Sequence, residues 1–219
     1  MVESLIHVDW SLVAEYSEEE ISYYLYLEGK NAEAISKIRN INKEVVQSHI
    51  LNGKIKYGII AKCKNISELF NTILNSSKAD KLGVLNYLEP KVETDLVRFI
   101  TEGYADMLPK EKEIAIWLLG ELKLKESYHI LIKASVHKFT NIRRMAISAM
   151  GKISDEYFET ALIKALDDSN PQVILYSIKS LNKINSTKAS NKIKKIFEST
   201  NKDYLKAAAE NWLESKAIS

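Results

Sequence analysis

The sequence contains little glycine, proline or cysteine: seven, three and one of 219 residues. The scarcity of glycine and proline argues against a β-rich or loop-rich protein and favours helices. The single cysteine, Cys63, excludes an internal disulfide framework and suits a reducing compartment. No window approaches the run of about 18 apolar residues that a membrane span needs, and no signal peptide is recognisable. We therefore expect a cytoplasmic, helical protein that does not bind a membrane.

The sequence also lacks common signatures of catalysis and of metal binding. It has no glycine-rich phosphate loop, no His-Glu-x-x-His and no cysteine pair. The four histidines are scattered, and His129 and His137 have no carboxylate at ligand spacing. We expect a non-catalytic protein with no cofactor and no metal.

The net charge is only +2, but the charges are unevenly distributed along the chain. Residues 1–29 hold seven acidic side chains and no Lys or Arg, whereas residues 30–64 hold eight Lys or Arg and two acids. Residues 179–195 hold six lysines and no acid. Blocks of this kind bear more on polyanion partners than the total charge does.

A repeat runs from about residue 140 to residue 182. Ile142 recurs as Val173, Ile147 as Ile178, and Gly151 has its counterpart in Gly120, each after a step of 31 residues. A fixed step of this length indicates a solenoid, in which one two-helix unit buries its apolar face only when its neighbours stack on it. We expect about four to five such units.

The repeat resembles HEAT repeats of the short, lyase-type variety. The residues that carry the resemblance are Asp168, Pro171 and Val173 in one unit and Ile142, Arg143, Ala146, Ala149 and Gly151 in the unit before it. The resemblance implies an α-α superhelix and gives Arg143 a structural role, bonding an acidic residue of an adjacent unit, with Asp168 as a possible partner. These repeats serve as scaffolds for many functions.

Basic residues that the repeat does not require are candidates for a binding surface on the solenoid: Lys133, Arg144, Lys192 and Lys195. We expect Asn141 and Asn170-Pro171 to begin the first helices of two units. The lysines of residues 188–195 would then lie on a second helix, which lines the inner surface in the family. A solvated helix face is the alternative. We assign Trp117 and Trp212 to the core.

The N-terminal part predicts a short helix, then a helix, a tight turn and another helix. Ser17 and Glu20 form a capping box. Asn31 caps a helix over residues 32–39, Asn40 tolerates the left-handed conformation of the turn, and Asn42 caps the next helix, which we expect Gly53 to end. Besides Asn40, the residues Ser36, Ile41 and Val46 match the pattern of small bacterial helix-turn-helix DNA-binding modules.

That resemblance implies a bacterial protein that binds double-stranded DNA. Early exposed residues of the second helix would meet base edges, namely Lys43, Gln47 and Ser48, with Glu44 beside them. Five cations would neutralise phosphates: Lys30, Lys37, Arg39, Lys54 and Lys56. The alternative is a three-helix cap that closes the open end of the solenoid.

Taken together, we predict an all-α protein with a helix-turn-helix-like module over residues 1–64 and a HEAT-type solenoid over residues 65–219. Its function is binding: DNA through the module and another protein on the solenoid. Two alternatives stay open. One is a pure protein-interaction scaffold. The other is a HEAT-like DNA alkylation-repair glycosylase, for which Trp117, Arg144, Asp167 and Asp168 are present.

Overall fold

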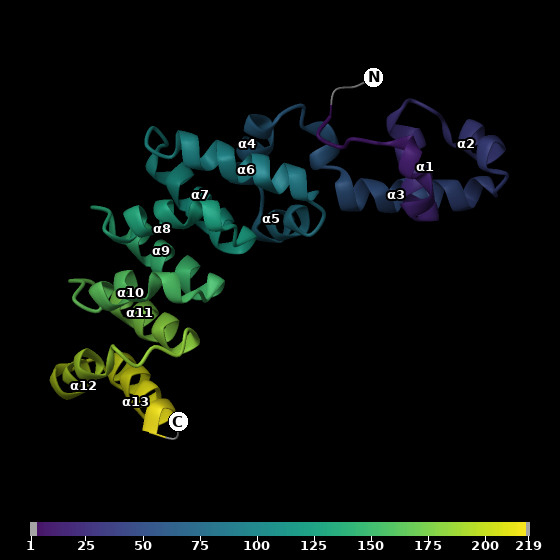
Figure 1. Ribbon diagram of the computed structural model, residues 1–219. Coiled ribbons are helices and arrows are strands. Elements are labelled where there is room, and N and C mark those ends of the chain that lie inside the picture. The colour runs from purple at the N-terminus through teal and green to yellow at the C-terminus, as the bar shows by residue number, and fades with distance from the viewer. Residues whose placement is uncertain (1–3, 218–219) are drawn as a thin grey trace. The chain divides into compact units, whose positions relative to one another are not determined.

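The computed structural model describes residues 4–217, and every regular element among them is a helix (Figure 1). The predicted all-α class with a HEAT-type solenoid is confirmed. The chain forms two compact units, residues 1–99 and residues 100–219. The predicted boundary after residue 64 lies within the first unit and stays a prediction for the end of an N-terminal module. The predicted domains also include residues 1–3 and 218–219, which lie outside the described residues.

The first unit begins with three helices that pack on one another. Helices α1 and α2 both pack on the long helix α3, and α5 contacts α3 and α4. The elements are η1 (Trp10–Glu15), α1 (Glu18–Leu27), α2 (Ala32–Arg39), α3 (Lys43–Tyr57), η2 (Ile60–Lys62), α4 (Ile66–Asn75), α5 (Lys78–Leu85) and the first part of α6 (Pro90–Gly103).

Side-chain caps set the helix starts that the sequence predicts. The Ser17 hydroxyl accepts from the Glu20 amide, and the Glu20 carboxylate accepts from the Ser17 amide at 2.8 Å. Asn31 and Asn42 accept from backbone amides at the starts of α2 and α3. Between these helices Asn40 has φ 51° and ψ 46°, the left-handed conformation predicted for the turn. These four predictions are confirmed.

Gly53 does not end α3, contrary to the sequence-based prediction. The helix continues to Tyr57, and Gly53 is buried against Tyr23 of α1. A Cβ atom at position 53 would lie 2.7 Å from the Tyr23 Cβ. Glycine is therefore needed here because it lets two helices approach closely, and the sequence pattern of a helix stop was misleading.

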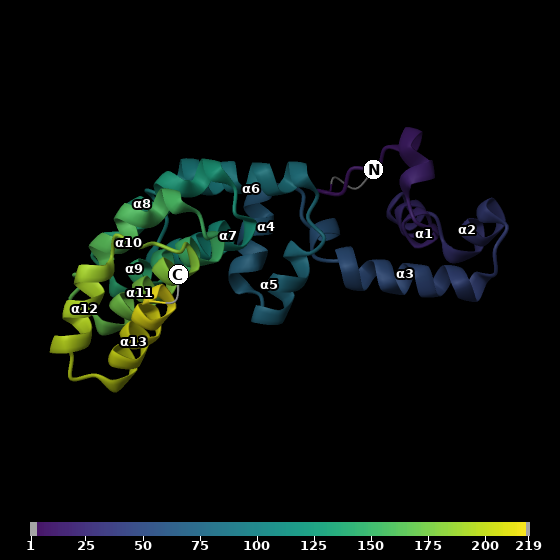
Figure 2. The same ribbon diagram turned by 60° about the horizontal axis from the view of Figure 1, so that its bottom comes forward.

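The second unit is built from two layers of helices (Figure 2). We call α7, α9, α11 and α13 the inner layer: each stacks on the next, and they follow the inner side of the curve. We call α8, α10 and α12 the outer layer, and each packs on the inner helix that follows it. The elements after α6 are α7 (Pro109–Leu122), η3 (Lys125–Ser127), α8 (Tyr128–Ser135), α9 (Thr140–Ile153), η4 (Glu156–Phe158), α10 (Glu159–Ala165), α11 (Pro171–Lys183), α12 (Ser190–Ser199) and α13 (Asp203–Ala217).

This pairing corrects the predicted phase of the repeat. Asn141 and Asn170-Pro171 begin α9 and α11, which are second helices of their pairs, because α9 packs on the preceding α8 and α11 on the preceding α10. By the same pairing α12 is a first helix. The lysines of residues 188–195 are therefore on or beside the outer layer, and the prediction that they line the inner surface is wrong.

The inner helices approach closely at a contact that recurs with the 31-residue step. A Cβ atom on Gly120 of α7 would lie 2.7 Å from the Ala149 Cβ of α9. A Cβ atom on Gly151 of α9 would lie 2.8 Å from the Ser180 Cβ of α11. The Ser180 hydroxyl also donates to the Ile147 carbonyl at 3.1 Å. Paired small residues thus set the spacing of the inner layer.

Arg143 and Asp168 form the predicted structural ion pair. The Arg143 Nε donates to Asp168 Oδ2 at 2.6 Å, and Nη2 donates to Oδ1 at 2.9 Å, a two-point contact between α9 and the loop before α11. Burial by itself would raise the pKa of Asp168, but hydrogen bonds from Arg143 and from the Asn170 amide outweigh it and lower the pKa. The family-based role of Arg143 is confirmed.

Candidate binding surfaces

A small hollow opens on the inner layer between α7 and α9. It has a volume of about 180 Å³. The lining residues are Trp117 of α7 and Arg144, Met145, Ser148, Ala149 and Lys152 of α9. Trp212, in contrast, is buried with 1% exposure, as predicted.

Trp117 belongs to this hollow and not to the core, contrary to the prediction. Its neighbours Ile116 and Leu118 are fully buried, whereas Trp117 is half-buried. An apolar residue at a repeat position looks the same in the sequence whether it faces the core or a surface hollow. Only the packing of α7 on α9 separates the two cases.

Arg144 lines the hollow and is positioned by an aromatic ring. Its guanidinium carbon is 5.6 Å from the centre of the Tyr176 ring of α11. Such cation–π contacts contribute about 0.5–1 kcal/mol at exposed sites. Among residues 4–217, Arg144 forms no ion pair, whereas the adjacent Arg143 is bound to Asp168. The two neighbouring arginines therefore differ. Arg143 has a carboxylate partner within the fold, whereas the guanidinium of Arg144 can bind an anion from another molecule.

The charge around the hollow changes sign along the inner layer. The 31-residue step places Glu113 and Glu121 of α7 in register with Arg144 and Lys152 of α9. Lys152 forms an ion pair with Glu121 one repeat before it. On α11, Lys179 and Lys183 are exposed, and neither forms an ion pair within the described part of the chain. In this register α7 thus carries carboxylates, whereas the charged residues of α9 and α11 are all cations.

The four predicted solenoid-surface residues do not form one surface. Arg144 lies in the inner layer, whereas Lys133 of α8 and Lys195 of α12 are exposed on the outer layer. Lys192 of α12 is half-buried, and its Nζ lies 2.5 Å from Asp167 Oδ2. The structure therefore separates Arg144 from the three lysines.

The four residues considered for a repair glycosylase are not brought together either. Trp117 and Arg144 meet in the hollow, but Asp167 and Asp168 lie in the loop between α10 and α11, bound to Lys192 and Arg143. No residue that lines the hollow is a carboxylate.

In the first unit, α1, α2 and α3 form what we call the three-helix module. Its core contains Ile35 and Val46, both fully buried, together with Ile50. The Ser36 hydroxyl donates to the Ile41 carbonyl at 2.6 Å and so bridges the turn. These contacts place the start of α3 on the outside of the module.

Six of the eight residues predicted to contact DNA are exposed, and two are used within the module. The exposed ones are Lys30, Lys37, Lys43, Gln47, Ser48 and Lys54. Arg39 has 8% side-chain exposure and binds the Glu18 carboxylate and the Ser22 hydroxyl. Lys56 lies 2.6 Å from the Glu19 carboxylate and lowers the pKa of that carboxyl as a hydrogen-bond donor. The acidic start of the chain therefore neutralises part of the basic segment after it.

The exposed face of α3 is less polar than a DNA-reading helix requires. Leu51 is 60% exposed and Ile55 is 75% exposed. They are four residues apart and lie on one face of the helix. Val45 is also exposed. The helix-turn-helix pattern assigns contacts only to polar positions of this helix and gives no role to these apolar side chains.

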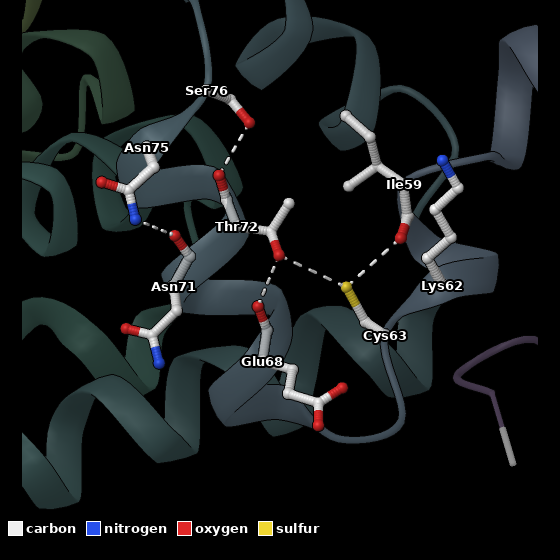
Figure 3. Close-up of a pocket in the computed structure, with 8 residues that line it drawn as sticks. All are labelled: Ile59, Lys62, Cys63, Glu68, Asn71, Thr72, Asn75 and Ser76. Carbon is white, nitrogen blue, oxygen red and sulfur yellow. Dashed lines mark hydrogen bonds between the residues drawn. The ribbon is translucent and has the colours of Figure 1, made fainter.

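Cys63 lies at the edge of a polar hollow of about 660 Å³ in the first unit (Figure 3). Its buried thiol donates to the Ile59 carbonyl at 3.2 Å, and burial raises its pKa. The other lining residues are Lys62, Glu68, Asn71, Thr72, Asn75 and Ser76. A buried thiol with a raised pKa is an unreactive, packed cysteine, despite the lysines around it in the sequence.

Within residues 4–217, no three His, Cys, Asp or Glu side chains are grouped so that they could hold a metal ion. No helix in the same range combines the length and the apolar character needed to cross a bilayer.

Helix pairs in two stacked layers define the second unit as an α-solenoid. Residues 131–214, which run from α8 into α13, match the family model described as HEAT repeats. The match supports a HEAT-repeat protein, and HEAT repeats suggest a scaffold for protein interactions. The comparison with curated proteins gave no match.

Proposed function

We propose that the protein is a non-catalytic scaffold that binds a partner protein on the inner layer of its second unit. The observation that carries this proposal is the hollow between α7 and α9, lined by Trp117 and Arg144. Tryptophan and arginine are enriched among the residues that dominate protein interfaces. Here the two side chains share one hollow, where a partner could contact both.

The same hollow supports a non-catalytic role. Its charged lining residues are Arg144 and Lys152, and Lys152 is bound to Glu121. It contains no carboxylate, imidazole or thiol that could serve as general base or nucleophile. These side chains are suited to hold an anionic group and have no means of activating one.

Photo-crosslinking at matched positions tests which layer binds the partner. A photoreactive amino acid replaces Lys179 on the inner layer, or Lys133 on the outer layer, both exposed lysines of the second unit. In a lysate of the source cells, we expect discrete protein adducts from position 179 and none of these from position 133. Equal adducts from both positions, or adducts from position 133 alone, would contradict the proposal.

DNA binding through the three-helix module is a second candidate function. The observation that favours it is the left-handed turn at Asn40 followed by an exposed start of α3, where Lys43, Gln47 and Lys54 lie on one side of the helix. Lys30 is also exposed. These three lysines form no ion pair among the described residues.

Affinity for a duplex of roughly 20 base pairs, measured at about 50 mM and about 200 mM salt, tests this candidate. Three phosphate contacts predict a slope of log K against log salt of about −2.7. The informative variant is Lys43→Gln with Gln47→Ala, because both side chains are exposed. Arg39 is unsuitable, since its loss would disturb the module. Absence of binding at the lower salt concentration would eliminate this function.

A further inference from the structure

We propose that the partner presents a short acidic peptide segment to the inner layer. One large apolar side chain of that segment enters the hollow against Trp117 and Met145, and a carboxylate beside it binds Arg144. This inference rests on the proposed scaffold function and names the chemistry of the ligand.

The volume of the hollow favours a single side chain. Pockets for small-molecule ligands and cofactors have volumes of about 300–1,000 Å³, whereas this hollow has about 180 Å³. Its walls combine the indole of Trp117 with the thioether of Met145, and methionine adapts its shape to irregular apolar groups. Ser148 and Ala149 are small and leave the space open. The hollow therefore fits an aromatic or branched aliphatic side chain.

The charges next to the hollow favour an acidic segment. Arg144 has no carboxylate partner among residues 4–217, and the Tyr176 ring holds its guanidinium in place. A guanidinium binds a carboxylate through two parallel hydrogen bonds, which gives both strength and orientation. Lys179 and Lys183 continue the positive charge along α11. A segment that runs from the hollow over α9 to α11 would therefore meet helices whose charged residues are all cations.

The same face is poorly suited to a nucleic acid. A bound phosphate backbone requires a continuous positive band. Here α7 carries Glu113 and Glu121 next to the hollow, and α13 exposes Glu210 and Glu214. Carboxylates thus flank the basic stretch over α9 and α11 on both sides. A short peptide needs only that central stretch.

A selection from displayed random peptides of about 12 residues on the immobilised full-length protein tests the inference. We expect enriched peptides to carry Asp or Glu within a few positions of a Phe, Leu, Ile or Trp. Arg144→Gln removes the charge and should weaken the selected peptides at least about tenfold, because charge-assisted bonds are the strong ones. Trp117→Leu should weaken them as well. Lys133→Gln, on the outer layer, should leave their affinity unchanged. Circular dichroism establishes that each variant is folded.

The other outcomes separate the inference from the proposed function. The inference of an acidic ligand would be overturned if the selected peptides lack acidic residues, or if Arg144→Gln leaves their affinity unchanged. Adducts at position 179 would in that case still support the proposed scaffold function. Failure to select any peptide, together with no adduct at position 179, would overturn both. If single-stranded or duplex DNA binds the protein and Arg144→Gln abolishes that binding, the ligand is a nucleic acid and the inference of a peptide ligand is overturned.

Discussion

Gly151→Ala tests the close contact that sets the spacing of the inner layer. The added methyl group would lie 2.8 Å from the Ser180 Cβ and 3.2 Å from its Cα, both shorter than normal carbon contacts. It would also displace the Ser180 hydroxyl from the Ile147 carbonyl, which it reaches at 3.1 Å. Both helices are anchored by further stacking, so neither can move away freely.

The expected cost follows from three contributions. Overpacking of this kind costs about 1–3 kcal/mol, and loss of a buried hydrogen bond costs about 1 kcal/mol. Alanine recovers about 1 kcal/mol relative to glycine inside a helix. The net loss in free energy of unfolding is therefore about 1–3 kcal/mol, which lowers Tm by roughly 2–12 °C for a chain of this size.

Urea unfolding measures the energetic coupling between positions 151 and 180. It compares the wild type, Gly151→Ala, Ser180→Gly and the double variant. Ser180→Gly removes the side chain that the new methyl group would meet, so Gly151→Ala should cost at least about 1 kcal/mol less in the Ser180→Gly background. Gly83→Ala is the matched control: position 83 is inside α5, and an added Cβ meets no atom within 4 Å. That variant should be neutral or up to about 1 kcal/mol more stable. Additive effects of Gly151→Ala and Ser180→Gly would refute the contact.

Three further predictions concern other parts of the fold. Arg143→Met leaves Asp168 nearly buried without its partner and should cost about 3–5 kcal/mol by urea unfolding. Because folding lowers the pKa of Asp168, the wild-type ion pair contributes its full stabilising free energy above the unfolded pKa of about 3.9. Urea unfolding at decreasing pH should show this stabilisation lost as pH falls below that value. Asn40→Ala should be less stable than Asn40→Gly by about 1–2 kcal/mol, because the turn is left-handed. Gly53→Ala should destabilise the three-helix module through its clash with Tyr23, detectable as faster amide exchange in α1 and α3.

The sequence predicts the helical class, the solenoid and several local features, because these depend on short-range signals. The N-caps at Asn31 and Asn42 and the left-handed Asn40 need only neighbouring residues. The Arg143–Asp168 pair was accessible because the repeat fixes which positions face each other across units. The caps and the turn can be predicted from neighbouring residues, and the ion pair from the 31-residue step.

The sequence does not reveal which helices pair or which side of a helix becomes a surface. A repeat of 31 residues has the same step whichever helix is counted first, so the step alone does not assign α12 to the outer layer. Two residues have ambiguous local signals. Gly53 could end a helix or allow two helices to approach closely, and Trp117 could be a core residue or line a surface hollow. Arg39 looked like a phosphate ligand because its partner Glu18 is distant in the sequence. All four depend on tertiary packing.

The adduct yields at positions 179 and 133 test the central claim, binding of a partner on the inner layer, most directly. The two photoreactive variants are compared in one lysate, with the Arg144→Gln substitution added to each. The proposed scaffold predicts discrete adducts at position 179, fewer of them with Arg144→Gln, and no such adducts at position 133. Equal yields at both positions, unchanged by Arg144→Gln, would contradict it.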